Sequence, residues 1–297
     1  MKATAHIFSN LPLVVIVGPT ASGKTSLGIE LAVEFGGEII CADSRTIYKG
    51  MDIGTAKPTA AEQLGIPHWG LDLVAPGEYY SAADFKEYAD EKIAEIRARG
   101  HVPFLVGGTG LYIDGVIFDY TFGSKADTAV RAKLEKYSLE ELQNYCKNNN
   151  IVLPENDKNK RYVVRAIEQS SSHQRSKGEL DINTIIVGIA TEKDELRRRI
   201  VARAEHLFEN GMVDEAIRLG EKYGWESEAM TANIYRLTKN YLDGELSKSE
   251  LQAAFVTSDW RLAKRQLTWL KRNSFIHWAS LTEAKIYLQE QLAKITG

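Results

Sequence analysis

The chain has 297 residues, of which 44% are apolar and 26% charged, as in ordinary globular proteins and unlike disordered or fibrous chains. At about 150 residues per domain this length predicts two domains, and no apolar run approaches the roughly 18 residues that would cross a bilayer. The net charge of −3 excludes a surface that is positive throughout, so any nucleic-acid binding requires local basic patches.

The first ten residues, MKATAHIFSN, contain no apolar run that ends at a small-residue cleavage site. We therefore expect no secretory signal and a cytoplasmic protein, with a monomer as the default state. Cys41 and Cys146 are the only cysteines, which is too few for a disulfide framework and lacks the spacing of a zinc or redox motif. The isolated histidines likewise lack the spacing of metal ligands.

A phosphate-binding motif follows the first predicted strand, residues 11–17. Residues 18–25 match G-x-x-x-x-G-K-[ST] and precede a segment with helical periodicity, the context that supports a P-loop. The residues of this loop are Gly18, Pro19, Thr20, Ala21, Ser22, Gly23, Lys24 and Thr25. Backbone N–H groups, the helix N-terminus and Lys24 are suited to phosphate oxygens, and Thr25 to Mg²⁺.

The motif alone does not identify the phosphate ester. ATP is the usual ligand of such a loop, which predicts nucleotide binding or phosphorylation of a small molecule. We find no apolar strand ending in an evident pair of magnesium-binding acids, although Asp43 follows a strand. The alternative is that the loop holds a diphosphate as a leaving group.

Two further predicted strands, residues 38–42 and 103–106, end beside polar residues. Since the carboxyl ends of parallel strands meet at one sheet edge, Asp43 and Thr109 should face the phosphate loop. A carboxylate in this place suits a general base or a Mg²⁺ ligand, or it caps the turn that follows the strand.

The later elements complete a predicted α/β fold. We predict helices over residues 82–100 and, with a break near Gly211, over 194–223, and a fourth strand over 184–190. Residues 119–180 read as a small helical insertion, and the chain is helical again from about residue 245. The fold class is therefore a P-loop NTPase-like, doubly wound parallel sheet formed by residues 1–118 and 181–297, with a helical insertion and a helical C-terminal region.

Two segments are rich in basic residues. Residues 158–177 contain six bases and one acid, Glu168, and residues 261–272 contain five bases and no acid. The bases of the first segment are Lys158, Lys160, Arg161, Arg165, Arg175 and Lys177. Each segment is either a solvated helix face or a patch that neutralises RNA phosphates.

Six segments in order resemble motifs of the tRNA dimethylallyltransferases, which prenylate the adenine next to the anticodon. They are GPTASGKT (18–25), ADS (42–44), YKGMDIGTAKP (48–58), YSAADF (80–85), GGTGLYI (107–113) and AKRQLTW (263–269). Three of them, YKGMDIGTAKP, GGTGLY and AKRQLTW, are far more restrictive than the phosphate loop.

The resemblance implies that residues 18–25 hold the diphosphate of dimethylallyl diphosphate together with Mg²⁺. The dimethylallyl group would be transferred to N6 of adenosine 37 in tRNAs that read codons beginning with U. By the same resemblance, Asp43 takes the proton from N6, Thr109 assists at the diphosphate, and Lys24 stabilises the leaving charge. The substrates would be dimethylallyl diphosphate and the anticodon stem-loop of tRNA.

The resemblance also implies which residues meet tRNA, since a stacked adenine must turn out of the anticodon loop to react. These residues are Asp43, Ser44, Arg45, Thr46, Thr109, Arg131, Arg161, Arg165, Lys264, Arg265 and Gln266.

The chain departs from the family pattern at several positions. Thr231 and Ile234 stand where an Arg and a Gly are usual, and Trp260 and Tyr162 stand where Arg is expected. Three of these changes remove an expected positive charge, and two alternatives stay open beside tRNA prenylation. One is prenylation of free adenine nucleotides, and the other is an RNA-binding relative with weakened catalysis.

Overall fold

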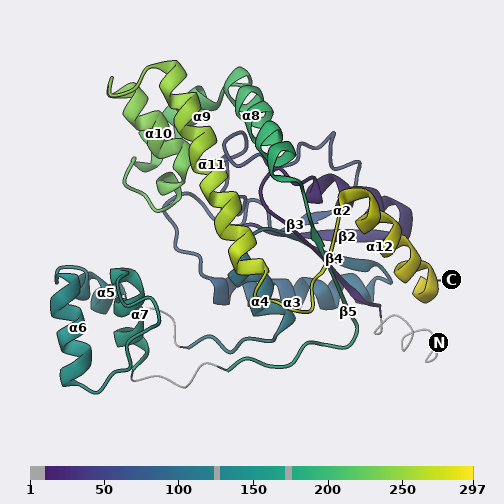
Figure 1. The fold of residues 1–297 in the computed structure, drawn as a ribbon, viewed down its shortest axis with the longest axis horizontal. Coiled ribbons are helices and arrows are strands. Elements are labelled where there is room, and N and C mark those ends of the chain that lie inside the picture. The colour runs from purple at the N-terminus through teal and green to yellow at the C-terminus, as the bar shows by residue number, and fades with distance from the viewer. Residues whose placement is uncertain (1–10, 124–127, 171–175, 297) are drawn as a thin grey trace. The chain divides into compact units, whose positions relative to one another are not determined.

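The computed structural model describes residues 11–123, 128–170 and 176–296. The chain divides into a larger unit, Met1–Ile117 with Leu180–Gly297, and a smaller one, Phe118–Glu179 (Figure 1). The expected insertion, residues 119–180, differs from the smaller unit by one residue at each end.

Within the described part of the larger unit, six parallel strands form one sheet in the order β3-β2-β4-β1-β5-β6. They are β1 (Leu13–Val17), β2 (Gly37–Ala42), β3 (His68–Trp69), β4 (Val102–Gly107), β5 (Thr184–Ile189) and β6 (His277–Ala279). β1 is central, with Val15 in register with Leu105 of β4 and Ile186 of β5. Since both faces of a parallel sheet are covered, its strands are continuous apolar runs, and all five residues of β1 are buried.

The prediction of four strands was wrong by omission. β3 and β6 have only two and three residues and extend the sheet at its two edges. Neither strand has the apolar run that marks a buried strand. Both lie at an edge of the sheet, where His68 and Trp69 are partly exposed and His277 is exposed.

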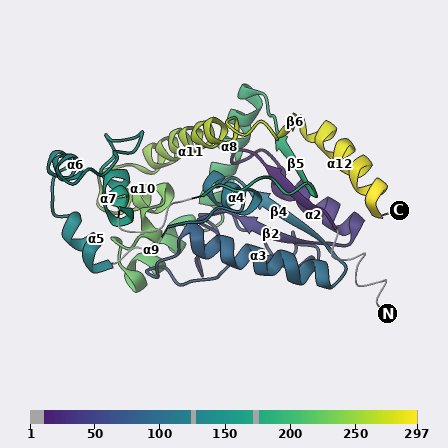
Figure 2. The same ribbon diagram turned by 90° about the horizontal axis from the view of Figure 1, so that it is seen from below.

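Helices cover both faces of the sheet, as the doubly wound prediction requires. α2 (Lys24–Phe35) and α12 (Leu281–Thr296) pack together on one face, where Leu31 and Leu288 join a cluster with Ile16 and Val106. α3 (Ala82–Ala98) contacts β2 and β4, and α4 (Gly110–Ile117) packs beside it. Figure 2 shows α3 along one side of the sheet and α12 on the other.

A second group of helices follows β5. It contains α8 (Lys193–Glu209), α9 (Met212–Tyr223), the 3₁₀ turn η1 (Ala229–Thr231), α10 (Asn233–Leu242) and α11 (Lys248–Leu270). The predicted break at Gly211 is confirmed: this residue precedes α9 with φ 89°, a conformation that favours glycine. Phe208, Tyr235 and Phe255 of this group pack with Tyr48 and Met51, which follow β2.

The smaller unit has its own core. α5 (Thr128–Leu134), α6 (Leu139–Asn148) and α7 (Lys160–Gln169) surround buried Leu142, Cys146, Val163, Val164 and Ile167. Its helical character agrees with the prediction.

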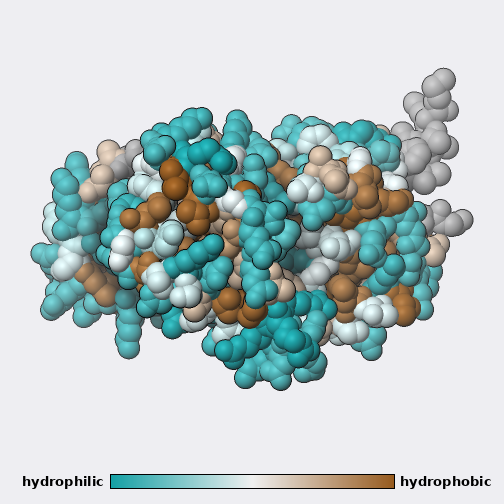
Figure 3. Space-filling view, turned by 90° about the horizontal axis from the view of Figure 1, so that it is seen from above, coloured by the Kyte–Doolittle hydropathy of each residue, from teal (hydrophilic) through white to brown (hydrophobic). Residues whose placement is uncertain are grey.

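Among the described residues no helix is both long and apolar enough to span a membrane. On the face drawn in Figure 3, apolar side chains lie in separate patches among hydrophilic ones.

Candidate active site

The phosphate loop joins β1 to α2 in a conformation that depends on glycine. Gly23 precedes α2 with φ 89°, and Ala21 also has a positive φ of 62°. A Cβ atom on Gly18 would lie 2.7 Å from the Oγ of Ser22. Because α2 begins at Lys24, the unpaired N–H groups of its first turn and its dipole favour an anion at the loop.

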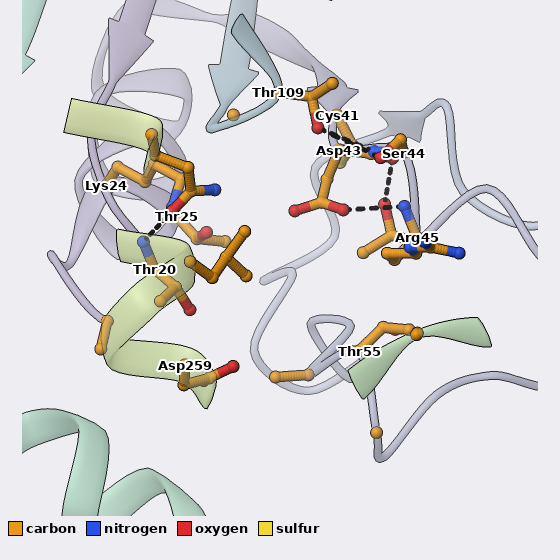
Figure 4. Close-up of a pocket in the computed structure, with 18 of the residues that line it drawn as sticks. Thr20, Lys24, Thr25, Cys41, Asp43, Ser44, Arg45, Thr55, Thr109 and Asp259 are labelled. Carbon is orange, nitrogen blue, oxygen red and sulfur yellow. Dashed lines mark hydrogen bonds between the residues drawn. The ribbon is translucent and has the colours of Figure 1, made fainter. Parts of the chain in front are cut away.

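A cavity of about 450 Å³ opens beside this loop. Its lining includes residues 20–25 of the loop, the segment from Asp43 to Thr46, Thr109, Arg265 and Gln266 (Figure 4). Gly18 and Pro19 are outside the lining, and the Pro19 carbonyl accepts a hydrogen bond from Lys24 Nζ at 3.1 Å. The structure thus brings together most residues predicted for the diphosphate and the reacting base.

The ammonium group of Lys24 loses its proton more readily than that of an ordinary lysine. Burial lowers the pKa of Lys24 to about 8, with the Asp43 carboxylate opposing the change and the Arg203 guanidinium adding to it. The ammonium group is therefore poorly solvated and short of counter-charge, which favours its interaction with an incoming anion.

Asp43 and Thr109 lie across the cavity from the loop. Thr109 Oγ1 accepts the N–H of Ser44 at 3.0 Å, which connects the ends of β2 and β4. Asp43 Oδ1 accepts the N–H of Arg45 at 2.8 Å, so Asp43 caps the turn, and its carboxylate points toward the loop side of the cavity (Figure 4). The capping and chemical interpretations of Asp43 are therefore compatible.

The nearby thiol of Cys41 is poorly suited to act as a nucleophile. Burial, with the Asp43 carboxylate, raises the pKa of Cys41 to about 12, so the thiolate is scarce at neutral pH.

The AKRQLTW segment lies in α11 and holds the loops together. Gln266 Oε1 accepts the N–H of Thr20 at 2.8 Å, and Trp269 Nε1 donates to Asp114 Oδ2 at 2.7 Å. A Cβ atom on Gly110 would lie only 2.1 Å from the Trp269 ring. Lys264 is not part of the cavity lining, and its ammonium lies 5.9 Å from the ring centre of Trp260.

The YKGMDIGTAKP segment forms another wall. Its Gly54, Thr55 and Ala56 line the cavity. Glu215 of α9, 1% exposed, accepts hydrogen bonds from the N–H groups of residues 52, 53 and 54 at 2.7–2.9 Å. It also accepts one from Tyr235 Oη at 2.8 Å, so a buried carboxylate positions this wall.

Several cavity residues were missed by sequence reasoning. Arg203 of α8 lines the cavity and donates from Nη1 to Thr20 Oγ1, while Arg199, one turn earlier, donates to the Ser22 carbonyl at 3.2 Å. Asp259 of α11 also lines the cavity. The spacing of four between Arg199 and Arg203 places them on one helix face, but Arg197 and Arg198 beside them gave no means of choosing that face.

The departures from the family pattern have two different surroundings. Thr231 and Ile234 line the cavity. Trp260 instead packs against Leu196, Ile200 and Ala263, so its side chain belongs to a small apolar cluster. Arg203 supplies one positive charge to the cavity in which Thr231 stands in place of an expected Arg.

The basic residues of the smaller unit surround one acid. Arg131 makes two hydrogen bonds of 2.8 Å to Glu168, and Arg165 Nη1 donates to the same carboxylate at 3.2 Å. The Glu168 side chain is 3% exposed, whereas those of Arg131 and Arg165 are 22% and 26% exposed. Arg161 is exposed, and Arg175 lies outside the described residues. Contact of these residues with tRNA stays a prediction.

The donors around the loop fit a magnesium ion that is held jointly with phosphate. In the described part of the chain, no group of three or more His, Cys, Asp or Glu side chains could hold a metal by itself. The cavity offers the Thr25 hydroxyl and two carboxylates, Asp43 and Asp259. Mg²⁺ commonly takes one or two protein oxygens together with substrate phosphates and water.

Comparison with known protein families identifies the family of this chain. A family model described as IPP transferase matches residues 46–273, and one described as isopentenyl transferase matches residues 11–71. The chain belongs to the IPP transferase family. The family resemblance inferred from the sequence motifs is thereby confirmed.

Named relatives align along almost the whole chain. The tRNA dimethylallyltransferases of Bacillus velezensis and Bacillus subtilis are 37% and 36% identical to it, each with 91% of both chains covered. The solved full-length tRNA isopentenylpyrophosphate transferase from Bacillus halodurans is 34% identical with a TM-score of 0.73, covering 96% of this chain and 98% of that one.

A solved eukaryotic dimethylallyltransferase, described as acting on tRNA, has a TM-score of 0.76 at 24% identity, with 91% and 73% of the two chains covered. At this identity the likeness concerns the fold alone. Together with the parallel sheet covered on both faces, these neighbours confirm the predicted P-loop type α/β fold.

Proposed function

We propose that the protein transfers the dimethylallyl group of dimethylallyl diphosphate to N6 of adenosine 37 in tRNAs that read codons beginning with U. The observation that carries this proposal is one cavity in which the phosphate loop faces Asp43 and Thr109, in a member of this family. A relative that aligns over 91% of the chain is named tRNA dimethylallyltransferase, which supports transfer of a dimethylallyl group to tRNA.

Dimethylallyl diphosphate fits a cavity whose lining has a cationic part and an apolar part. Lys24, Arg203 and the amides at the start of α2 receive the diphosphate, and Thr25 would hold Mg²⁺. When bound, Mg²⁺ supplies positive charge that offsets the diphosphate charge. Apolar residues of the lining suit the five-carbon group, namely Ile39, Leu71, Val106, Ile234, Phe255 and Leu262.

The reaction is a substitution at the allylic carbon. The N6 lone pair forms the N–C bond while the C–O bond to the diphosphate breaks, and its electron pair leaves with the diphosphate. Asp43 accepts the N6 proton, which a weakly basic aromatic amine must lose. Lys24 and the loop amides stabilise the charge that grows on the leaving oxygen, and Thr109 holds the loop after β2 that carries Asp43.

The tRNA is bound through its anticodon stem-loop, with the target base turned out of its stack. We assign the cavity residues Ser44, Arg45, Thr46, Arg265 and Gln266 to the target nucleoside. We assign the exposed Lys264 of α11, together with Arg131, Arg161 and Arg165 of the smaller unit, to RNA phosphates. The reaction takes place in the cytoplasm with the protein as a monomer, a state that light scattering after size exclusion measures.

The test is incubation of the protein with radiolabelled dimethylallyl diphosphate, Mg²⁺ and unmodified tRNA, followed by nucleoside analysis. We expect label in N6-isopentenyladenosine from position 37. Asp43→Ala should lower the transfer rate by roughly 10²–10⁴-fold, the usual contribution of a general base, with tRNA affinity unchanged. Asp90→Asn is the matched control, because Asp90 lies on α3 and pairs with Lys86 at the surface.

The same experiment separates the alternatives. Transfer to AMP as fast as to tRNA would favour the nucleotide prenyltransferase. Salt-dependent tRNA binding without transfer would favour the RNA-binding relative. Retained transfer in Asp43→Ala would exclude Asp43 as the base.

A further inference from the structure

Asp259 is an acidic residue in an unexpected place. It lies on α11 and is 5% exposed, yet it lines the cavity beside residues 20–25 of the phosphate loop. Figure 4 shows its carboxylate directed into the cavity. A buried carboxylate is costly unless a cation or hydrogen-bond donors compensate it.

The described residues compensate the charge of Asp259 only in part. Among the described residues, its Oδ2 has no hydrogen-bond partner, and no ion pair within 4 Å includes Asp259. Burial raises the pKa of Asp259, and the nearby Arg203 guanidinium only partly offsets this effect. Arg203 donates to Thr20 Oγ1 and leaves its own Nε buried without a partner.

These two unsatisfied groups are complementary to one ligand. Arg203 presents an N–H donor and positive charge beside the loop, which suits a phosphate oxygen. Asp259 presents an acceptor and negative charge in the same cavity, which would repel a phosphate directly. A divalent cation between the carboxylate and the phosphate turns this repulsion into attraction.

We propose that Asp259 is a protein ligand of the divalent cation that accompanies the diphosphate, together with the Thr25 hydroxyl and diphosphate oxygens. The inference rests on the proposed function, because it takes diphosphate as the anion in the cavity. The ligand set matches the hard, oxygen-rich coordination of Mg²⁺ with few protein ligands. Asp43 then stays available to take the N6 proton.

The proposal distinguishes two kinds of binding. Without metal, removing the charge of Asp259 should leave the affinity for inorganic diphosphate unchanged or increase it, because a repulsive carboxylate is lost. With diphosphate bound, the same change should weaken metal binding. A purely structural acid would not separate these two affinities.

The experiment uses Mn²⁺ as the probe and inorganic diphosphate as the anion, without tRNA. Electron paramagnetic resonance measures the Mn²⁺ Kd at saturating diphosphate, and calorimetry in EDTA measures metal-free diphosphate binding. For Asp259→Asn we expect the Mn²⁺ Kd to rise about tenfold or more, the scale of losing metal-site interactions. Asp90→Asn should match the wild type.

An unchanged Mn²⁺ Kd in folded Asp259→Asn would overturn the proposal. A second measurement uses wild-type protein alone, in case this variant does not fold. Iron(II), ascorbate and peroxide, with diphosphate present, should cleave the chain beside residue 259 as well as in the phosphate loop, and cleavage at the loop alone would also overturn it.

These outcomes are independent of the proposed transferase activity. Wild-type protein that transfers the prenyl group but shows no role for Asp259 refutes only the metal assignment. Metal and diphosphate binding through Asp259 without transfer to tRNA refutes only the proposed function.

Discussion

The lowered pKa of Lys24 predicts a specific pH dependence of diphosphate binding. With a pKa of about 8, Lys24 in the free protein is about nine-tenths charged at pH 7 and about one-tenth charged at pH 9. Bound diphosphate favours the charged form and raises this pKa. Binding above pH 8 therefore requires proton uptake, so the affinity falls as the pH rises.

The magnitude follows from these fractions. If only charged Lys24 contributes, wild-type protein should lose about tenfold in diphosphate affinity between pH 7 and pH 9 relative to Lys24→Ala. At pH 7 the variant should bind about 10–100 times more weakly, which corresponds to one hydrogen bond to a charged group.

The assay is calorimetric titration with inorganic diphosphate in EDTA, at several pH values. Because the anion titrates in the same range, the quantity to follow is the ratio of the Kd of Lys24→Ala to that of the wild type, in which the anion's own protonation cancels. Lys222→Ala, an exposed change on α9, is the control for loss of one charge. A ratio that stays constant from pH 7 to pH 9 would refute the reasoning.

Three further predictions concern groups that hold the site in place. Burial favours the neutral form of Glu38, but hydrogen bonds from Arg99, His101 and Trp69 outweigh this effect and lower the pKa of Glu38 to about 2. The stabilisation that the Glu38 carboxylate gives the fold is therefore complete above pH 4.5 and is lost as the pH falls to 2. Glu38→Gln should lower Tm by about 5 °C at pH 7, for about 2 kcal/mol, and by progressively less in acid; a pH-independent difference would contradict this. Glu215→Gln should lower the free energy of unfolding, measured in urea, by about 2–4 kcal/mol and should raise the KM for dimethylallyl diphosphate. Tyr235→Phe removes one of the four hydrogen bonds to Glu215, so both effects should be smaller. Gly110→Ala should cost about 1–3 kcal/mol, because its Cβ meets the Trp269 ring, and normal stability would show that the ring can move.

Local sequence patterns were sufficient for the centre of the fold and the first half of the site. A buried β-branched strand, a glycine-dependent loop and a periodic helix follow one another between Leu13 and Phe35, and each is dictated by neighbouring residues. The meeting of Asp43 and Thr109 with this loop also follows from the sequence, because parallel strands share one carboxyl edge. The smaller helical unit was likewise predictable from its composition and its position between strands.

The remaining features depend on which surfaces meet in the folded chain. β3 and β6 are strands because a neighbouring strand offers them hydrogen-bond partners, whereas their few residues carry no periodic signal. Arg203 reaches Thr20 across 183 positions, and Gln266 reaches it across 246. No local pattern separates Arg203 from the other arginines of α8, or marks Asp259 as buried, because the orientation of a helix is set by its packing. The sequence by itself determined the phosphate loop and its strand, whose geometry is local, while the tertiary structure alone decided which distant charges surround the loop.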